Sequence, residues 1–398
     1  MNEEKREHSH FEDEVTVLAT KRIFFEAIEK RASDILIEPL FDSLQIRYKV
    51  DGIFYKFHSL PLELHSRIVT HIKAISNLNI AEHRLPQEGR FRIKKFAGEE
   101  VDMRVSVIPS TLGEKVALRI LDRSRVELNL DKLGFDDKSL EILKRNLKRS
   151  WGIILICGPA GSGKTTTLYS ALKFIDSIEK NIITIEDPVE YDLYGINQVN
   201  INESVGLTFA SVLRSVLRQD PDVILVGEMR DLETVEIALR ASLTGHLVLS
   251  TLHTTSASSA IVRLKDMGAE PFLIASSLLC VCAQSLLRVL CECKTPYKPH
   301  HEIIKLFDSY GIKMNEDSYL YQNKGCQKCF NTGFKGRKGI VEIVEITPAI
   351  REKINKSATE RDIQEMALSE GLKTLKYNAL SDVKEGITTL EEVFRVLE

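Results

Sequence analysis

The stretch Gly158-Pro-Ala-Gly-Ser-Gly163-Lys164-Thr165 decides the fold class of this chain of 398 residues. It matches the pattern G-x-x-x-x-G-K-[ST], whose glycines let backbone N–H groups converge on the phosphates of a nucleotide. A continuous apolar run over residues 152–157 precedes it, and a helical stripe follows it: Leu168, Ala171, Leu172 and Ile175. Because the motif needs this order of strand, loop and helix, the sequence predicts a nucleoside triphosphate site rather than a chance glycine-rich turn.

The predicted nucleotide contacts come from this loop and the start of the helix. Lys164 is expected to reach the β- and γ-phosphates, and the Thr165 hydroxyl is expected to hold Mg²⁺. A nucleoside triphosphate with Mg²⁺ is therefore the predicted ligand. The predicted nucleotide-binding residues of this segment are Gly158, Pro159, Ala160, Gly161, Ser162, Gly163, Lys164, Thr165 and Thr166.

Three further apolar runs, over residues 181–185, 223–227 and 247–251, lack the alternation of a half-buried strand. Runs of this length are typical of strands that are buried on both faces of a parallel sheet. Helical stripes separate the runs along the chain. We therefore predict a doubly wound parallel α/β core with right-handed crossovers.

Polar side chains follow each of these runs: Glu186, Asp187 and Glu190 the first, Glu228 the second, and His253 the third. Ligands of open α/β sheets bind at the carboxyl ends of the strands, so these side chains are expected near the phosphates. One carboxylate of the first group would orient or deprotonate the attacking water, with an acidic surface loop as the alternative. Glu228 takes the Walker-B place near Mg²⁺, and His253 is a candidate sensor of the γ-phosphate.

Arg214 and Arg218 lie four residues apart, before the run at 223–227, and therefore share one helix face. A solvated pair is the usual explanation of such a spacing. Beside a nucleotide site, the alternative is an arginine finger that faces the phosphates of a neighbouring subunit. The spacing alone favours neither the solvated pair nor the arginine finger.

The flanking segments predict further domains. Apolar and polar residues alternate over 44–50 and 101–107, which indicates half-buried strands, and Asp51-Gly52 predicts a hairpin turn. The apolar segment 271–287 is expected to be a packed helix. The predicted organisation is a flexible tail (1–14), an α+β domain (15–124), a linker (125–135), the nucleotide-binding α/β core (136–289), a cysteine-rich metal-binding subdomain (290–336) and a helical C-terminal subdomain (337–398).

Composition narrows the class of protein. Lys plus Arg number 54 and Asp plus Glu number 57, and a formal charge of −3 is not the footprint of a bulk nucleic-acid binder. No apolar run reaches the length of a spanning helix, and residues 2–14 are too polar for a signal peptide. Seven cysteines without an export signal indicate reduced thiols. We therefore expect a cytoplasmic protein.

The order and spacing of these blocks resemble the secretion ATPases of type II secretion and type IV pilus assembly. The match runs from about Ala32 to Glu398 and includes residues 32–39, 84–90, 158–165, 186–190, 217–222, 241–246 and 250–254. The resemblance implies a homo-hexameric ring of two-lobed subunits with ATP between a PAS-like and a RecA-like lobe. It also implies an inner-membrane platform protein and cytoplasmic domains of the machinery as partners, peripheral attachment to the inner membrane through them, and no nucleic acid.

The resemblance also assigns roles to single residues. It implies that Glu190 is the general base, Glu228 the Walker-B acid and His253 the histidine-box residue. It implies phosphate-binding arginines at Arg90 and Arg104 in the first lobe and at Arg214 and Arg218 in the second, which favours the finger over the solvated pair. The predicted catalytic set is Lys164, Glu190, Arg214, Arg218, Glu228 and His253.

Four cysteines of the 290–336 segment are candidate ligands of a structural Zn²⁺: Cys291, Cys293, Cys326 and Cys329. Four thiolates satisfy a tetrahedral site, and Cys326-Gln-Lys-Cys329 has the favoured C-x-x-C spacing. The first pair, Cys291-Glu-Cys293, is one residue shorter than the family's usual pair. Four reduced thiols in a self-sufficient loop are the alternative, and Cys280 or Cys282 is an alternative ligand in place of Cys291.

The leading hypothesis is a cytoplasmic ATPase that converts hydrolysis into inter-lobe motion and drives assembly of a pilus or pseudopilus. A RecA-type nucleic-acid translocase is the runner-up, against which the net charge and the absence of an aromatic-rich basic groove argue. A non-hydrolysing, nucleotide-gated scaffold is the third hypothesis, and it would require loss of the acids that are present. Because the retraction branch of the family typically lacks the cysteine module, assembly or secretion is favoured over retraction.

Overall fold

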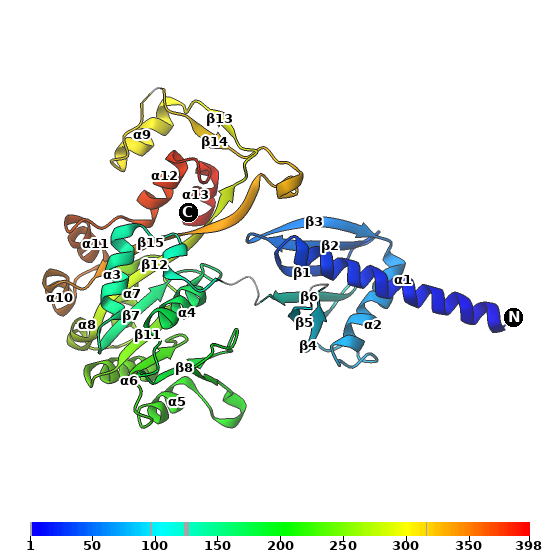
Figure 1. Ribbon diagram of the computed structural model, residues 1–398, viewed down its shortest axis with the longest axis horizontal. Coiled ribbons are helices and arrows are strands. Elements are labelled where there is room, and N and C mark those ends of the chain that lie inside the picture. Colours follow the sequence, from blue (N-terminus) through cyan, green and yellow to red (C-terminus); the bar gives the residue numbers. More distant parts are fainter. Residues whose placement is uncertain (1, 96–97, 123–126, 316) are drawn as a thin grey trace. The chain divides into compact units, whose positions relative to one another are not determined.

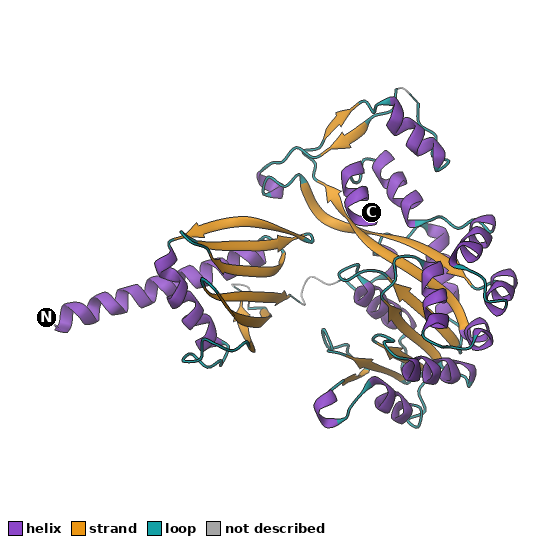
Figure 2. Cartoon of the chain, turned by 180° about the vertical axis from the view of Figure 1, so that it is seen from behind, coloured by secondary structure: helices purple, strands orange, loops and turns teal. Residues whose placement is uncertain are grey.

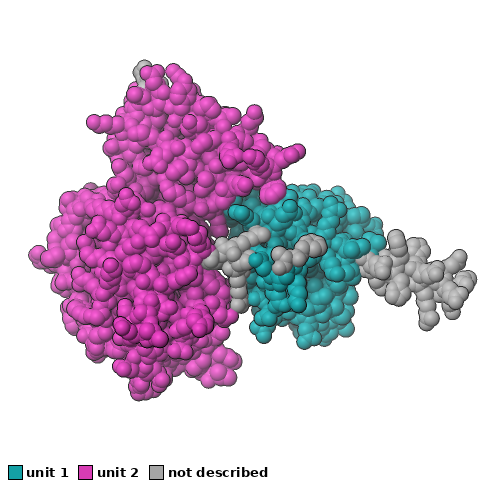
Figure 3. All heavy atoms as spheres, in the orientation of Figure 1, with its two compact units in different colours: residues 1–126 teal, residues 127–398 magenta. Residues whose placement is uncertain are grey.

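The computed structural model describes residues 2–95, 98–122, 127–315 and 317–398. The chain forms two compact units, Met1–Val126 and Glu127–Glu398 (Figure 3). The boundary that we predicted at residues 124–126 lies outside the described residues.

The first unit is a six-stranded antiparallel sheet with helices packed on one face. Its strand order is β3-β2-β1-β6-β5-β4. Buried residues alternate with partly exposed ones along β2 and β5, as the sequence predicts for a sheet with one covered face. The elements are α1 (Asn2–Glu29), β1 (Ala32–Pro39), β2 (Leu44–Val50), β3 (Ile53–Leu60), α2 (His65–Ile75), β4 (Gln87–Lys94), β5 (Glu100–Ser110) and β6 (Gly113–Leu121).

Two local features of this unit bear on the sequence predictions. Asp51 and Gly52 join β2 to β3 with φ angles of 49° and 90°, so the predicted hairpin turn is confirmed and has both central residues in the left-handed region. Helix α1 begins at Asn2 and therefore includes the residues for which we expected a flexible tail. Ile23, Phe24 and Ile28 of α1 are buried against the sheet together with Ile68 and Ile72 of α2.

The second unit is built on a seven-stranded sheet in the order β15-β12-β7-β11-β10-β8-β9 (Figures 1 and 2). All neighbouring strands run parallel except β12 and β15, which are antiparallel. The four strands that the apolar runs predict are buried along their whole length: β7 (Gly152–Cys157), β8 (Ile182–Glu186), β10 (Val223–Val226) and β11 (Leu247–Leu252). The doubly wound core is thus confirmed, and β9 (Asn197–Asn200) closes one edge.

Helices cover both faces of this sheet. One face packs on α3 (Asp137–Leu147) and α4 (Lys164–Ile175). The other packs on α5 (Phe209–Val216), α6 (Leu232–Leu243), α7 (Ala257–Asp266) and α8 (Pro271–Ser277). Residues next to each other in β7 alternate between the two cores, Ile153 and Leu155 in one and Ile154 and Ile156 in the other, which is why the run shows no polar alternation.

Two sequence predictions in this unit are wrong. The apolar segment 271–287 is not one helix, because α8 ends at Ser277 and β12 (Leu278–Leu290) begins at the next residue. The region after residue 337 is not entirely helical, because β15 (Phe334–Glu345) pairs with β12. Both strands extend the central sheet beyond β7, because β12 pairs with β7 and β15 pairs with β12. The apolar residues of 278–287 are therefore buried in a sheet and not in the packed helix that we expected.

The segment between β12 and β15 carries the four cysteines that are the predicted zinc ligands. It contains β13 (Thr295–Tyr297), α9 (His301–Ser309) and β14 (Leu320–Gln322), which lie apart from the central sheet in Figure 1. After β15 the chain is helical, as predicted: α10 (Pro348–Asn355), α11 (Glu360–Ser369), α12 (Leu375–Lys384) and α13 (Leu390–Leu397). None of the described helices has the length and apolar character needed to cross a bilayer.

Candidate active site

The glycine loop joins the end of β7 to the start of α4. Gly163 caps α4 with a φ of 91°, a conformation that residues with a side chain rarely adopt. At Gly158 a Cβ atom would lie 2.3 Å from the carbonyl oxygen of Gln284 on β12, so only glycine fits. The backbone of the loop is therefore free to turn its N–H groups toward an anion.

Lys164 and its neighbours fit the phosphates of a nucleotide. The Lys164 ammonium donates to the carbonyl oxygens of Gly158 at 2.8 Å and Pro159 at 3.0 Å, so it lies across the loop. Burial lowers its pKa, and the nearby carboxylate of Glu228 opposes this change. The hydroxyl of Thr165 belongs to an exposed residue at the start of α4, where a metal ion has access.

Gln284 supports this loop, and sequence reasoning missed it. It is a buried polar residue on β12, and its side-chain oxygen accepts a hydrogen bond of 2.7 Å from Thr167 on α4. Its amide nitrogen would be 2.8 Å from a Cβ at Gly163. The only local signal was a glutamine inside an apolar run, which does not reveal that β12 lies beside β7.

The acidic segment after β8 divides into a buried and an accessible part. Glu186 is 4% exposed, and Thr184, Gln198 and Tyr169 donate hydrogen bonds to its carboxylate. Burial and the Glu186 carboxylate both raise the pKa of Tyr169, which therefore stays protonated and donates. Glu186 is thus fully engaged in holding β8, β9 and α4 together.

Glu190 lies next to the first turn of the phosphate-loop helix. Its neighbour Tyr191 packs edge-on against Tyr169 of α4, with ring centroids 4.7 Å apart. Burial raises the pKa of Tyr191 to about 12, the Glu190 carboxylate adds to the rise, and Thr166 opposes it. These contacts attach the loop that carries Glu190 to the helix that begins at Lys164.

Glu228 and His253 meet at the carboxyl edge of the sheet, as their places after β10 and β11 predict. Nε2 of His253 lies 3.4 Å from a carboxylate oxygen of Glu228. Arg230 donates to Glu228 at 2.5 Å and lies 3.7 Å from Asp187. Arg230 was not predicted from the sequence. Its place two residues after Glu228 was the available signal.

The arginines fall into two groups. Arg214 of α5 pairs with Glu233. Arg218 lies two residues after the end of α5 and donates to the carbonyl oxygen of Arg214 at 2.9 Å, and both arginines are exposed. Arg90 and Arg104 face each other directly across β4 and β5. Like charges in opposed positions destabilise a sheet, so this pair fits an anion-binding role.

The four predicted cysteine ligands converge at the ends of β12 and β15. Their sulfur atoms all lie within 4.8 Å of one another. Sulfur–sulfur distances are 3.8 Å for Cys291–Cys326, 3.8 Å for Cys293–Cys329 and 3.7 Å for Cys326–Cys329. Thiolates at 2.3 Å from a tetrahedral Zn²⁺ lie about 3.8 Å apart, so the cluster matches zinc geometry despite its short first pair.

Backbone groups prepare Cys329 for a metal. The N–H groups of Cys326 and Gly333 donate to its sulfur at 3.1 and 3.3 Å. Burial alone would raise the pKa of Cys329, but these donors and the neighbouring thiols outweigh burial and lower it to about 7. Cys280 and Cys282, the alternative ligands, lie inside the central sheet and not in this cluster.

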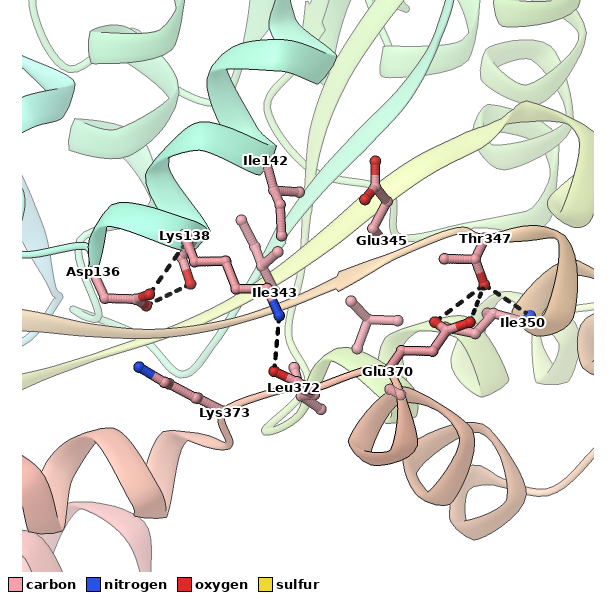
Figure 4. Close-up of a pocket in the computed structure, with 14 residues that line it drawn as sticks. Asp136, Lys138, Ile142, Ile343, Glu345, Thr347, Ile350, Glu370, Leu372 and Lys373 are labelled. Atoms are coloured by element: carbon pink, nitrogen blue, oxygen red, sulfur yellow. Dashed lines mark hydrogen bonds between the residues drawn. The ribbon is translucent and has the colours of Figure 1, made fainter. Parts of the chain in front are cut away.

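A cavity of about 100 Å³ lies away from the phosphate loop, between α3, β15 and the segment that joins α11 to α12 (Figure 4). Its polar side chains already have partners: Lys138 donates to the carbonyl oxygen of Gly371 at 3.2 Å, and Thr347 donates to Glu370 at 2.8 Å. None of the residues that line this cavity belongs to the glycine loop, so the cavity is separate from the predicted nucleotide site.

Comparison with known proteins agrees with this geometry. The family model described as "Type II/IV secretion system protein" matches residues 10–395. The chain belongs to this family. It is 48% identical to the Type II secretion system ATPase E of Vibrio cholerae over 372 residues, which are 93% of this chain and 73% of that protein. It is 43% identical to the Type IV pilus assembly ATPase PilB of Myxococcus xanthus over 385 residues, 96% of this chain and 68% of that one.

Two solved structures share the fold of this chain. The pilus retraction motor PilT with bound ADP matches with a TM-score of 0.63 and 28% identity, over 94% of this chain and 96% of that one. The ATPase DotB of Legionella pneumophila matches with a TM-score of 0.71, over 96% and 95% of the two chains, and its 19% identity makes this a likeness of fold alone.

Proposed function

We propose that this secretion-family protein is a Mg²⁺-dependent ATPase that works as a homo-hexamer and powers assembly of a pilus or pseudopilus. The observation that carries the proposal is the meeting of the glycine loop, Glu228 and His253 at the carboxyl edge of one parallel sheet. A glycine loop alone binds phosphate. The acid and the imidazole beside it add groups that respond to the γ-phosphate.

Each group has a distinct chemical task in this proposal. Lys164 and the loop N–H groups compensate the charge of the β- and γ-phosphates. Thr165 and Glu228 would hold Mg²⁺, which neutralises the charge that develops on the leaving phosphate oxygens. Glu190 accepts the proton of the attacking water, because Glu186 is already occupied by three donors. His253 reports the state of the γ-phosphate through its contact with Glu228.

Activity should depend on assembly. Arg218 is an exposed residue just after α5, and its described hydrogen bonds are with Arg214 and Ser215 and not with the glycine loop of its own chain. In this proposal it would contact the phosphates of a neighbouring subunit. We expect turnover per subunit to rise with protein concentration, measured by phosphate release alongside light scattering. An arginine finger contributes about 10³-fold or more, so Arg218→Ala should abolish most of the rise. Arg240→Ala, at an exposed arginine of α6, is the matched control. A monomer as active per subunit as the oligomer contradicts the proposal.

One assay separates the ATPase from the nucleic-acid translocase that was the runner-up hypothesis. Turnover is measured alone, with single-stranded DNA, and with vesicles that carry a membrane platform partner. We expect stimulation by the partner and none by DNA, because the chain has a formal charge of −3. Stimulation by DNA alone favours the translocase.

The cysteine cluster is proposed to hold one structural Zn²⁺. We expect about one zinc per chain in untagged protein, by elemental analysis, since four thiolates complete the tetrahedral site. Cys329→Ser should release the metal and destabilise the segment between β12 and β15, while the phosphate loop still binds nucleotide. Cys282→Ala, in the central sheet, should keep the zinc. Well under one zinc per chain after gentle purification rejects the site.

The proposed setting is the cytoplasmic face of the inner membrane. The chain would attach there through the platform protein and the cytoplasmic domains of its machinery, as the secretion and pilus relatives suggest. Genes beside that of this chain would distinguish a secretion pseudopilus from a motile pilus or a DNA-uptake filament.

A further inference from the structure

Glu342 is a buried carboxylate that the proposed reaction does not use. It lies on β15, is 5% exposed, and forms no ion pair with any residue that the structure describes. Burial raises its pKa, and two backbone N–H groups oppose that rise. A buried acid that is kept without a cation needs another explanation.

The two N–H groups belong to the first residues of two helices. One carboxylate oxygen of Glu342 accepts from Ala257 of α7 at 2.8 Å, and the other accepts from Leu375 of α12 at 3.0 Å. Side-chain caps already occupy other orphan N–H groups of these helices, Ser256 on α7 and Thr374 on α12. Glu342 thus joins the N-terminal ends of α7 and α12 through one side chain.

The loop that carries His253 leads directly into the N-terminal end of α7. Strand β11 ends at Leu252, His253 follows directly, and α7 begins at Ala257. Cys157, at the start of the glycine loop, approaches the carbonyl oxygen of Ser256 at 3.5 Å. The position of Ala257 therefore sets the backbone of a short loop that lies between the phosphate loop and Glu228.

A second contact ties the same loop to the C-terminal helices. Ser256 donates to Glu360 of α11 at 2.7 Å. Thus α11 contacts Ser256 directly, and α12 is linked to Ala257, the next residue, through Glu342 of β15. Movement of these helices would displace the loop at both points.

We propose that Glu342 is a positioning residue that fixes the His253 loop to α12, so that a shift of the C-terminal helices alters the His253–Glu228 contact. The proposal rests on the proposed ATPase function and adds a route by which a load on the C-terminal helices controls turnover. Glu342 does not touch the reacting atoms, so it acts through His253.

The test is a double-mutant cycle measured on the assembled full-length protein. Glu342→Gln keeps the shape of the side chain but leaves one acceptor oxygen for two N–H groups. We expect kcat to fall about 10-fold and KM for ATP to change less than 3-fold, because the glycine loop is untouched. In the His253→Ala background, Glu342→Gln should lower kcat less than 2-fold further, because coupled residues are non-additive.

A second pair of variants removes the donor rather than the acceptor. Leu375→Pro places proline at the first position of α12, which helices tolerate, and deletes the N–H that binds Glu342. Leu390→Pro makes the same change at the first position of α13, where the leucine is equally buried and the described contacts include no carboxylate on its N–H. Leu375→Pro should lower kcat as Glu342→Gln does, and Leu390→Pro should leave it near wild type at the same thermal stability.

The outcomes separate this inference from the proposed function. A wild-type protein without Mg²⁺-dependent hydrolysis overturns both. An active wild type in which Glu342→Gln and His253→Ala act independently, or in which Leu390→Pro is as slow as Leu375→Pro, overturns only the role of Glu342. If Glu342→Gln does not fold, the proline pair decides alone.

Discussion

Lys164→Ala is expected to lower ATP affinity and turnover together, by about 10²–10³-fold in kcat/KM. The Lys164 ammonium is the cation that lies across the glycine loop, and burial already weakens its solvation before any phosphate arrives. Removing it leaves the phosphate charge to the N–H groups alone. Binding of a fluorescent ATP analogue and phosphate release measure the two effects separately.

The matched control is Lys173→Ala. Lys173 lies on the same helix, in its last turn, and is exposed. The Lys173→Ala protein should bind and hydrolyse ATP as the wild type does. Near-normal affinity in the Lys164→Ala protein would show that the glycine loop is not the nucleotide site.

Glu190→Gln is expected to bind ATP as tightly as the wild type and to turn it over at least 100-fold more slowly. The amide keeps the shape of the side chain but cannot accept the proton of the attacking water. The measurement is a single-turnover assay on the assembled ring, with nucleotide affinity determined in parallel. Wild-type turnover in this variant would falsify the assignment of the base.

Substitutions of two neighbouring acids serve as comparisons for the Glu190→Gln variant. Glu186→Gln should lower thermal stability, because the amide would place a donor against Tyr169 and Thr184 in a buried site. Glu228→Gln should weaken Mg²⁺ binding, so that a higher Mg²⁺ concentration is needed for half-maximal turnover, and should weaken the contact with His253. Loss of the general base is therefore recognised by slow turnover with unchanged thermal stability and unchanged Mg²⁺ binding, which neither of the other two variants should show.

The central part of the fold was predictable because its signals are local. Apolar runs of strand length, separated by helical stripes, gave β7, β8, β10 and β11, and the glycine pattern placed the phosphate loop between β7 and α4. The ends of parallel strands share one edge of a sheet, so Glu228 and His253 were expected to meet, and they lie 3.4 Å apart.

The hairpin of β12 and β15 was not predictable in the same way. The segment 278–287 is apolar except for Gln284 and Ser285, and such a run fits a buried helix as well as a buried strand. The start of β15, Phe-Lys-Gly-Arg-Lys-Gly, has little strand propensity of its own. Its pairing with β12 over residues far apart in the chain determines the strand.

Non-local contacts also explain the functional residues that were missed. Gln284 and Glu342 are buried polar residues flanked by apolar ones in β12 and β15. In two of their three contacts, those with Thr167 and Ala257, the partner lies more than eighty residues away in the chain. No spacing rule connects such positions. The exposed arginines Arg214 and Arg218 are the reverse case, because their spacing is visible in the sequence but the proposed finger role depends on a second subunit.

The entry and exit of the cysteine segment have a consequence for how this fold varies. The N–H of Cys291 donates to the carbonyl oxygen of Gly333 at 2.9 Å, and Leu290 is the register partner of Phe334. The whole segment therefore leaves and rejoins the sheet at adjacent backbone positions, as a surface insertion does. Phe307, Ile312 and Leu320 of the segment belong to the same buried core as the residues of α12. A chimaera that carries a relative's segment can therefore keep the β12–β15 register only if it also supplies apolar side chains for α12, whereas a short turn would leave that core exposed.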